Sequence, residues 1–498
     1  MTISIGGKPA AGIQSLVDMR RTLDDLQRQL STGMKSSTYA GLGFDRGVTI
    51  GLRAQMSAIT GFDAVADQVQ TRLNVAQTSL GRMSEISSSV KTAMLQGSYG
   101  TGAVGAKVAQ TTAQFSLDET LSLLNTRAGD HYMFSGRATD TPAVESYDHI
   151  MNGYGTQAGL KQVMSERAQA DLGTSGLGRL TVTTSPAPTA SIVTLAEDGT
   201  HPFGFKLGSV TSTLTNATVA GPTGTPPEIS VDMSGGLPAV GESITLRFTL
   251  PDGSTENMTL TATDTSPAGV NQFVIGADAD TTAANLNTAL GTAVTKLAGT
   301  SLTAASAVQA SNDFFDTPPV RVTGPAFGSA TATNAGSATD TVMWYTGETG
   351  TDSARATTSA RIDQSLVVGY GVRANEEGLR GVVQNLATLA ALTISPNDPN
   401  ATDLSAALNS RLTAKLSGGP GIQSVADIST ELAGAQVSIN AAKSRHQQQS
   451  ATMGDYLQTI EGVSNEEIGA QILTLQTRLQ ASMQVTSMMY QTSLVNYI

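Results

Sequence analysis

The chain has 498 residues, no cysteine and a formal net charge of −12. Without cysteine it cannot form disulfides, iron–sulfur clusters or thiolate zinc sites. The negative charge provides no basic surface for a phosphate backbone, so we expect no nucleic-acid partner. The sequence lacks a run of about 18 apolar residues, the length that a transmembrane helix needs, so we expect no membrane span and no membrane partner.

Apolar residues near the N-terminus recur at alternating steps of three and four. This spacing places one apolar stripe along a helix, and a partner helix must pack on the stripe to bury it. The first such stripe consists of Leu16, Met19, Leu23, Leu26 and Leu30. It ends at a break formed by residues 31–33, which are Ser, Thr and Gly.

A longer stripe of the same kind predicts an unbroken helix from about Thr49 to Leu95. At 1.5 Å per residue such a helix is roughly 70 Å long, which is typical of a rod rather than of a globular domain. A third helical stretch is predicted from about Val108 to Thr126. The members of the longer stripe are Phe62, Ala66, Val69, Leu73, Ala76, Leu80, Met83, Ser87, Val90 and Met94.

The C-terminal part of the chain has the same pattern. Helical spacing resumes at Ile362 and continues to Leu389. Two further helical patterns consist of Ile428, Leu432, Val437 and Ile439, and of Ile468, Ile472, Leu475, Leu479 and Met483. Because neither end of the chain can bury its stripe alone, we expect the N- and C-terminal helices to pack together.

The middle of the chain alternates apolar and polar residues instead. Residues 180–184, 243–250 and 257–263 show the period of two that is typical of half-buried strands. Residues 251–253, Pro-Asp-Gly, predict a turn between two of these strands. Residues 280–290 predict one short helix that ends near Gly291.

These patterns predict an α+β protein in which long N- and C-terminal helices pack as a coiled-coil rod, with an inserted β-rich outer domain. The predicted parts are an N-terminal polymerisation helix and turn (1–48), the N-terminal part of the helical rod (49–180), the β-rich variable outer domain (181–346), the C-terminal part of the rod (347–460) and a C-terminal polymerisation helix (461–498).

The motifs that carry catalysis or cofactor binding are missing or out of context. The four histidines form no His-Glu-x-x-His frame. The glycines of residues 100–105 match the dinucleotide pattern but follow a helical stripe, so we expect a turn between helices there. Asp278 and Asp280 lack the Gly and Glu of a calcium loop, and helix capping explains them better. We therefore expect no enzyme, and no catalytic, cofactor or metal site.

Several segments, in this order, resemble the bacterial flagellin family and its hook-associated relatives. Leu23 and Leu26 precede the turn at residues 30–35 (LSTGMK). Leu124 and Asn125 precede residues 132–142 (YMFSGRATDTP), and residues 371–380 (GVRANEEGLR) resemble the return segment of these proteins. Residues 475–482 (LQTRLQAS) and 493–498 (SLVNYI) complete the likeness, which covers roughly residues 1–180 and 360–498.

The resemblance implies a structural subunit of the bacterial flagellum, placed at the hook–filament junction, that self-assembles through its terminal helices. It implies partners that are further copies, a neighbouring hook-associated protein, flagellin and an export chaperone on the C-terminal segment. It also implies an extracellular location reached by type III export without a cleaved signal peptide. We assign the assembly interface to Leu16, Met19, Leu23, Leu26, Leu30, Ile468, Ile472, Leu475, Leu479 and Leu494.

Two other functions remain open at this stage. A flagellin that forms the filament itself has similar terminal helices. A secreted β-rich adhesin with a helical stalk has a similar composition, although it does not need complementary stripes at both ends of the chain.

Overall fold

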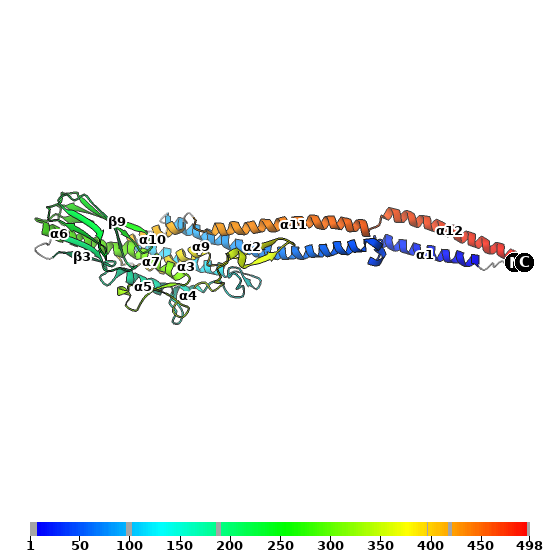
Figure 1. The fold of residues 1–498 in the computed structure, drawn as a ribbon, viewed down its shortest axis with the longest axis horizontal. Coiled ribbons are helices and arrows are strands. Elements are labelled where there is room, and N and C mark those ends of the chain that lie inside the picture. The colour runs from blue at the N-terminus through cyan, green and yellow to red at the C-terminus, as the bar shows by residue number, and fades with distance from the viewer. Residues whose placement is uncertain (1–6, 96–101, 186–190, 396, 417–420, 496–498) are drawn as a thin grey trace. The chain divides into compact units, whose positions relative to one another are not determined.

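The computed structural model describes residues 7–95, 102–185, 191–395, 397–416 and 421–495 (Figure 1). Helices and strands both contribute to the fold, which is of mixed α and β composition. The chain divides into two compact units. The first unit consists of Met1–Gln70, Ala360–Val368 and Gln436–Ile498, and the second of Thr71–Ser359 and Gly369–Ala435. None of the helices in the described ranges is long and apolar enough to cross a membrane.

Twelve α-helices lie in the described ranges. They are α1 (Gly7–Thr32), α2 (Arg46–Leu95), α3 (Gly102–Leu124), α4 (Tyr147–Asn152), α5 (Leu160–Leu172), α6 (Ala279–Leu297), α7 (Thr303–Phe315), α8 (Ala354–Thr357), α9 (Glu377–Ala391), α10 (Ala401–Leu416), α11 (Val425–Glu461) and α12 (Asn465–Val495). A 3₁₀ helix, η1 (Tyr39–Asp45), lies between α1 and α2.

Most of the strands lie in the stretch of sequence that alternates apolar and polar residues. They are β1 (Arg127–Ala128), β2 (His131–Tyr132), β3 (Leu180–Thr184), β4 (Ile192–Glu197), β5 (Lys206–Ser212), β6 (Thr218–Thr223), β7 (Glu228–Asp232), β8 (Ser243–Thr249), β9 (Thr255–Thr263), β10 (Gln272–Val274), β11 (Val320–Val322), β12 (Thr333–Ala335), β13 (Ser359–Arg361) and β14 (Val367–Gly369).

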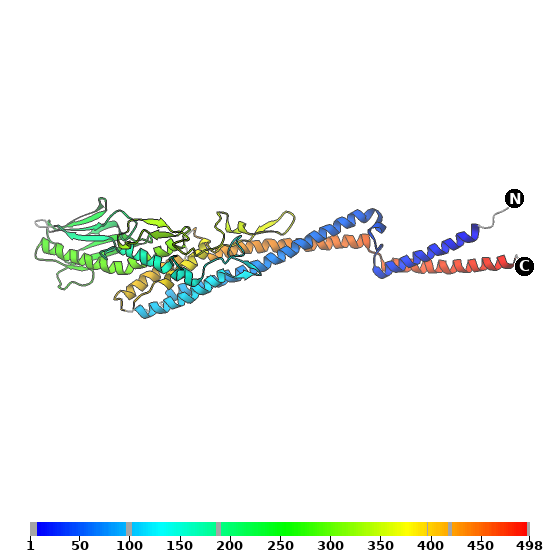
Figure 2. The same ribbon diagram turned by 90° about the horizontal axis from the view of Figure 1, so that it is seen from below.

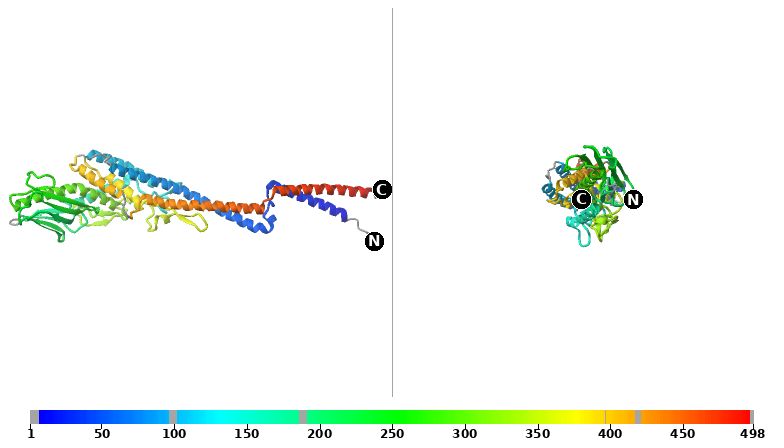
Figure 3. Two further views of the ribbon diagram at one scale, coloured as in Figure 1. Left: turned by 90° about the horizontal axis from the view of Figure 1, so that it is seen from above. Right: turned by 90° about the vertical axis from the view of Figure 1, so that its left-hand side faces the viewer.

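Two pairs of antiparallel helices make up most of the first unit. The helices α1 and α12 run side by side in Figures 1 and 2 and in the left view of Figure 3. Ion pairs from Lys443 to Asp67 and from Arg53 to Glu461 join α2 to α11. Residue numbers rise along α2 as they fall along α11 in these pairs, so the two helices are antiparallel.

Eight of the ten members of the long stripe of α2 are buried, as its spacing predicts. Phe62 and Ser87 are only partly buried, and Ile86, which the predicted stripe does not include, is 5% exposed. Nine of the ten members of the stripe, from Phe62 to Met94, are apolar, and those from Ala66 to Leu80 are at most 2% exposed.

The pattern predicted for α11 was wrong at one position, because Val437 is 68% exposed. Ile428, Leu432 and Ile439 are buried as predicted, but the buried face of α11 also contains small and polar residues that apolar spacing could not identify. Its members are Ile428, Leu432, Ala435, Ile439, Ala442 and His446.

Two four-stranded sheets belong to the second unit. Their orders are β3-β4-β7-β6 and β10-β9-β8-β5, and all neighbours are antiparallel except β10 and β9. The strands predicted at 180–184, 243–250 and 257–263 are confirmed as β3, β8 and β9. The Pro-Asp-Gly turn is confirmed too, since Gly253 has φ 81° and its N–H donates to the Leu250 carbonyl at 2.9 Å.

One apolar core joins the inner faces of both sheets to α6. Figure 2 shows α6 running along the strands, and it contacts β3, β4, β9 and β10. Leu286, Leu290 and Val294 of α6 are buried there. Asp278 caps this helix by accepting from the Thr281 N–H at 2.8 Å, as predicted. The predicted end near Gly291 was wrong, because α6 continues to Leu297 and the burial of its next turn outweighs the roughly 1 kcal/mol cost of a helical glycine.

Three other local predictions were wrong or incomplete. Helix α7 lies in the stretch predicted to be β-rich, and nearly every side chain on it is buried, so it has no polar face and no visible period. Helix α5 buries Glu166, Arg167 and Asp171. Because its buried face contains these charged residues, a search for apolar spacing does not identify the helix. Ile362 does not begin a helix, because it lies between β13 and β14 and is fully buried there.

The turn predicted at residues 100–105 lies partly outside the described residues. The described part, from Gly102, is already helical and belongs to α3, so this helix begins before the predicted Val108.

Candidate assembly interface

The stripes predicted at the two ends of the chain face each other in the first unit. Leu26 of α1 is 8% exposed and Ile468 of α12 is 5% exposed. The other members of this seam are partly buried, namely Leu16, Met19, Leu23, Ile472, Leu475 and Leu479. Most of the residues that we assigned to assembly are therefore brought together within one chain. Leu30 is 41% exposed, and the side chain of Leu494 lies outside the described residues.

The seam of α12 departs from prediction at its C-terminal end. Met483 was predicted to belong to it, but this side chain is 52% exposed. The partly buried positions that follow Leu479 are Ser482 and Thr486. These two polar residues keep the alternating step of three and four, so an apolar pattern could not identify them.

The remaining faces of α1 and α12 carry large apolar side chains that the chain itself does not cover. Ile13 and Val17 of α1 are 50% and 39% exposed. Leu473 and Val485 of α12 are 67% and 54% exposed. Both helices of the pair therefore expose large apolar side chains as well as burying a shared seam.

The segment after α1 ties the two ends of the chain together. Gly33 has φ 68°, a conformation that favours glycine, and it ends the helix. The backbone N–H of Lys35 donates to the Glu461 carbonyl at 2.7 Å, and the Val463 N–H donates to the Gly33 carbonyl at 3.2 Å. The Lys35 ammonium donates to the Ile460 carbonyl at 2.9 Å, at the C-terminus of α11. The turn therefore pairs directly with the α11–α12 connection.

A groove of about 350 Å³ lies between α1 and α12. Leu26, Ala470 and Leu475 supply its apolar lining, and Glu467 and Arg478 supply charges of opposite sign. Thr22, Gln471 and Thr474 complete the lining. This lining suits the binding of an apolar side chain.

Two segments that carry the family resemblance meet in the second unit, although they are far apart in the sequence. Ser135 forms an antiparallel bridge with Arg373, and the Ala374 N–H donates to the Phe134 carbonyl at 2.8 Å. Phe134 is fully buried. Asn125 accepts from the N–H groups of Ala143 and Val144 at 2.8 and 3.0 Å, which holds the end of the first segment. The resembling residues therefore form one local structure.

A buried ionic cluster that the sequence did not reveal holds α5 to α7. The Arg167 guanidinium lies 2.9 Å from Asp171 of its own helix and 2.9 Å from Asp313 of α7. Burial raises the pKa of Asp313, and the neighbouring Arg167 charge opposes that rise. Charged residues are rarely this buried, and their pairing explains why they can be.

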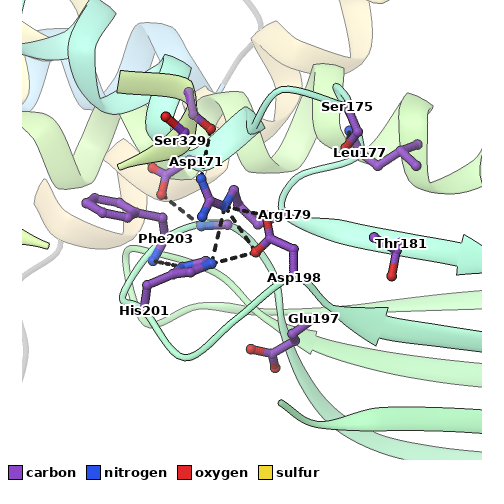
Figure 4. A network of polar contacts seen from close by, with 12 residues as sticks. Asp171, Ser175, Leu177, Arg179, Thr181, Glu197, Asp198, His201, Phe203 and Ser329 are labelled. Carbon is purple, nitrogen blue, oxygen red and sulfur yellow. Dashed lines mark hydrogen bonds and ion pairs between the residues drawn. The ribbon is translucent and has the colours of Figure 1, made fainter. Parts of the chain in front are cut away.

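A second part of the cluster lies beside the sheets (Figure 4). Arg179, in the left-handed region with φ 67°, lies 2.8 Å from Asp198 and donates to the Gly328 carbonyl at 2.8 Å. His201 Nε2 lies 2.5 Å from Asp198, and its Nδ1 accepts from the Phe203 N–H at 3.3 Å. These bonds use both ring nitrogens of His201, so the ring holds a loop in place.

No group of three or more His, Asp or Glu in the described ranges is arranged to hold a metal ion. Comparison with models of known protein families finds no match to the chain, and a search of curated protein sequences finds none either.

Proposed function

We propose that this protein is a structural subunit of the bacterial flagellum, of the hook–filament junction type, and that it assembles through its terminal helices. The observation that carries the proposal is the pairing of α1 with α12. Each helix buries one apolar stripe on the other, and each presents further apolar residues outward, among them Val17 and Leu473. A subunit that associates along a filament needs one apolar face to hold its own helices together and a second to contact its neighbours.

The position of the resembling segments supports the same proposal. Residues 31–35 pair with the α11–α12 connection, and residues 132–142 pair with residues 372–374. The two segments of the second contact both resemble the same family and lie far apart in the sequence, so they form one structural unit rather than scattered likenesses. The resemblance is thus supported by contacts as well as by order in the sequence.

In this proposal α1, α2, α11 and α12 form a coiled-coil rod, and residues 181–346 form the outer domain. The protein has no catalytic role and works by contact alone. Its partners are other copies, a neighbouring hook-associated protein and flagellin, with an export chaperone on the C-terminal segment before assembly. It leaves the cell by type III export and resides in the extracellular flagellum.

Immunogold labelling of the native bacterium tests the proposal. Label confined to the boundary between hook and filament is expected, together with loss of filaments when the gene is deleted. Label along the whole filament would instead identify a flagellin. Label on the cell surface away from flagella, with normal motility in the deletion strain, would contradict the flagellar function and favour the adhesin.

Substitutions on the two sides of the helix pair separate its two roles. Leu26→Asp and Leu479→Asp place a carboxylate in the α1–α12 seam, so they should reduce both helix content and swimming. Leu473→Asp changes the outward face, so it should reduce swimming while helix content stays unchanged. Gln27→Asp and Gln476→Asp are exposed controls and should swim normally. Export is checked by comparing secreted and intracellular protein. Normal swimming by all the apolar variants would contradict assembly through these helices.

A further inference from the structure

Phe44 is the most exposed large apolar residue in the described part of the chain, with 105% of its reference surface in solvent. It lies in η1, and Gly43 before it has φ 62° and ψ −124°, which breaks the regular helix at that point. Tyr39, Val48 and Ile50 are also 45–54% exposed. A phenyl ring held out by a structured turn exposes apolar surface that folding within the chain does not require.

The same unit contains a groove of suitable size and chemistry. The α1–α12 groove has a volume of about 350 Å³, and Leu26, Ala470 and Leu475 line it. Phe44 cannot occupy the groove of its own chain in this structure, since its ring is fully exposed. The first unit therefore presents an uncovered aromatic side chain and an unfilled groove at the same time.

The charges beside the two features are complementary. Asp45 and Arg46 directly follow Phe44 in the sequence. Glu467 and Arg478 lie at opposite ends of the lining that α12 contributes to the groove. Each surface thus carries one acidic and one basic residue beside its apolar part. Opposite charges can therefore meet when the ring enters the groove, and a partner without these charges binds less well.

We propose that Phe44 of one copy inserts into the α1–α12 groove of a second copy. The proposal rests on the proposed function, because it names the contact by which copies assemble. The two surfaces differ, so the contact is heterologous: each copy gives its ring to one neighbour and takes a ring from another. Such a contact continues from copy to copy into a ring or a helical array, and does not stop at a closed dimer.

Cysteine cross-linking tests the contact directly, because the natural chain has no cysteine. The full-length variants F44C and A470C are mixed and oxidised under conditions in which the wild type assembles. A disulfide-linked heterodimer is expected at a rate at least ten times that of the control mixture, F44C with Q476C. Gln476 lies on the same helix and is exposed but does not line the groove. Equal rates in the two mixtures would overturn the proposal.

Sedimentation of full-length Phe44→Ser measures the contribution of the ring. Loss of one buried phenyl group should weaken self-association about 10- to 100-fold. The helix content should stay the same, because the ring packs on nothing in the monomer. Phe115→Ser, on α3 with 73% exposure, is the matched control and should associate like the wild type. Unchanged association of Phe44→Ser, or a wild type that remains monomeric at every concentration, would overturn the proposal.

The outcomes separate this contact from the flagellar function. Correct labelling at the flagellum, combined with equal cross-linking rates, would overturn only the Phe44 contact. A specific F44C–A470C heterodimer from a protein that is absent from flagella would support the contact and overturn the flagellar function. In the double variant F44C/A470C, a cross-link that forms within one chain at high dilution would overturn insertion into a second copy.

Discussion

The Nδ1 atom of His446 lies 2.7 Å from the Oδ1 atom of Asp63, and this contact joins α11 to α2. His446 is 1% exposed and occupies a seam position that continues the apolar series Ile439 and Ala442. Its Nε2 atom faces Asp363 Oδ2 at 3.7 Å, and the ring stacks near Phe62. A polar residue in a helix seam specifies which residues lie opposite each other, because only one register brings its partner within reach.

Replacement of His446 should therefore destabilise the first unit. His446→Ala removes the bond to Asp63 and leaves a cavity, so we expect the free energy of unfolding to fall by about 1–3 kcal/mol. Urea unfolding followed by circular dichroism at 222 nm measures this change. Gln447→Ala, at the next and exposed position of α11, is the control and should stay within about 0.5 kcal/mol of the wild type. Equal stability of the two variants would show that the contact contributes nothing.

Truncation of two aliphatic residues of α11 should have very different effects on stability. Ile439 is fully buried, whereas Val437, two positions earlier, is 68% exposed. Ile439→Ala should lower the free energy of unfolding by about 2–5 kcal/mol, because it removes buried methyl groups and leaves a cavity. Val437→Ala should change it by less than about 0.5 kcal/mol. A larger loss for Val437→Ala in urea unfolding would mean that the buried face of α11 is assigned wrongly.

The Arg167 cluster should control both the stability and the pH response of the second unit. Arg167→Ala leaves Asp171 and Asp313 buried without their cation, and we expect a loss of about 3–5 kcal/mol at pH 7. The single tryptophan reports it, because Trp344 is buried against Phe315 of α7 with ring centroids 5.2 Å apart. Arg247→Ala, on an exposed part of β8, is the control and should change stability by less than about 0.5 kcal/mol.

The sign of the pH dependence follows from the raised pKa of Asp313. A carboxyl group whose pKa is raised by folding does not lower the free energy of unfolding below its ordinary pKa, because it is protonated in both states there. Above the raised pKa it lowers the free energy of unfolding by the full amount. Loss of Arg167 raises the pKa of Asp313 further, so the Arg167→Ala variant should regain part of its lost stability as the pH falls from 7 to 4. Tryptophan fluorescence during urea unfolding at both values measures the difference. A deficit that grows on acidification would contradict this account.

Asn125 should be the main polar support of the segment that follows α3. Its amide makes three bonds, two accepted from the backbone of residues 143 and 144 and one donated to the Val144 carbonyl at 2.9 Å. Asn125→Ala should lower the free energy of unfolding by about 2–3 kcal/mol, since each lost bond costs about 1 kcal/mol. Thermal unfolding measures the loss, with the exposed Asn257→Ala of β9 as the control. Equal melting temperatures for the two variants would contradict the role of Asn125.

Much of the local structure followed from the sequence because it depends on period alone. The stripe from Phe62 to Met94 identified α2, and strict alternation identified β3, β8 and β9. These elements bury one uniform apolar face, so burial and sequence pattern coincide. The α1–α12 seam was visible for the same reason, from Leu16 to Leu26 and from Ile468 to Leu479.

Tertiary structure decided the elements whose buried faces are not apolar. Arg167 and Asp313 are buried because each neutralises the other across two helices, and that pairing exists only after α5 meets α7. His446 is buried because Asp63 lies opposite it, 383 residues earlier in the chain. Periodicity identified the helices and strands that bury one apolar face, such as α2, β3, β8 and β9, since period depends only on neighbours in sequence. The partners of buried charges, and the surfaces left uncovered at Phe44 and in the α1–α12 groove, depend on which segments the fold brings together.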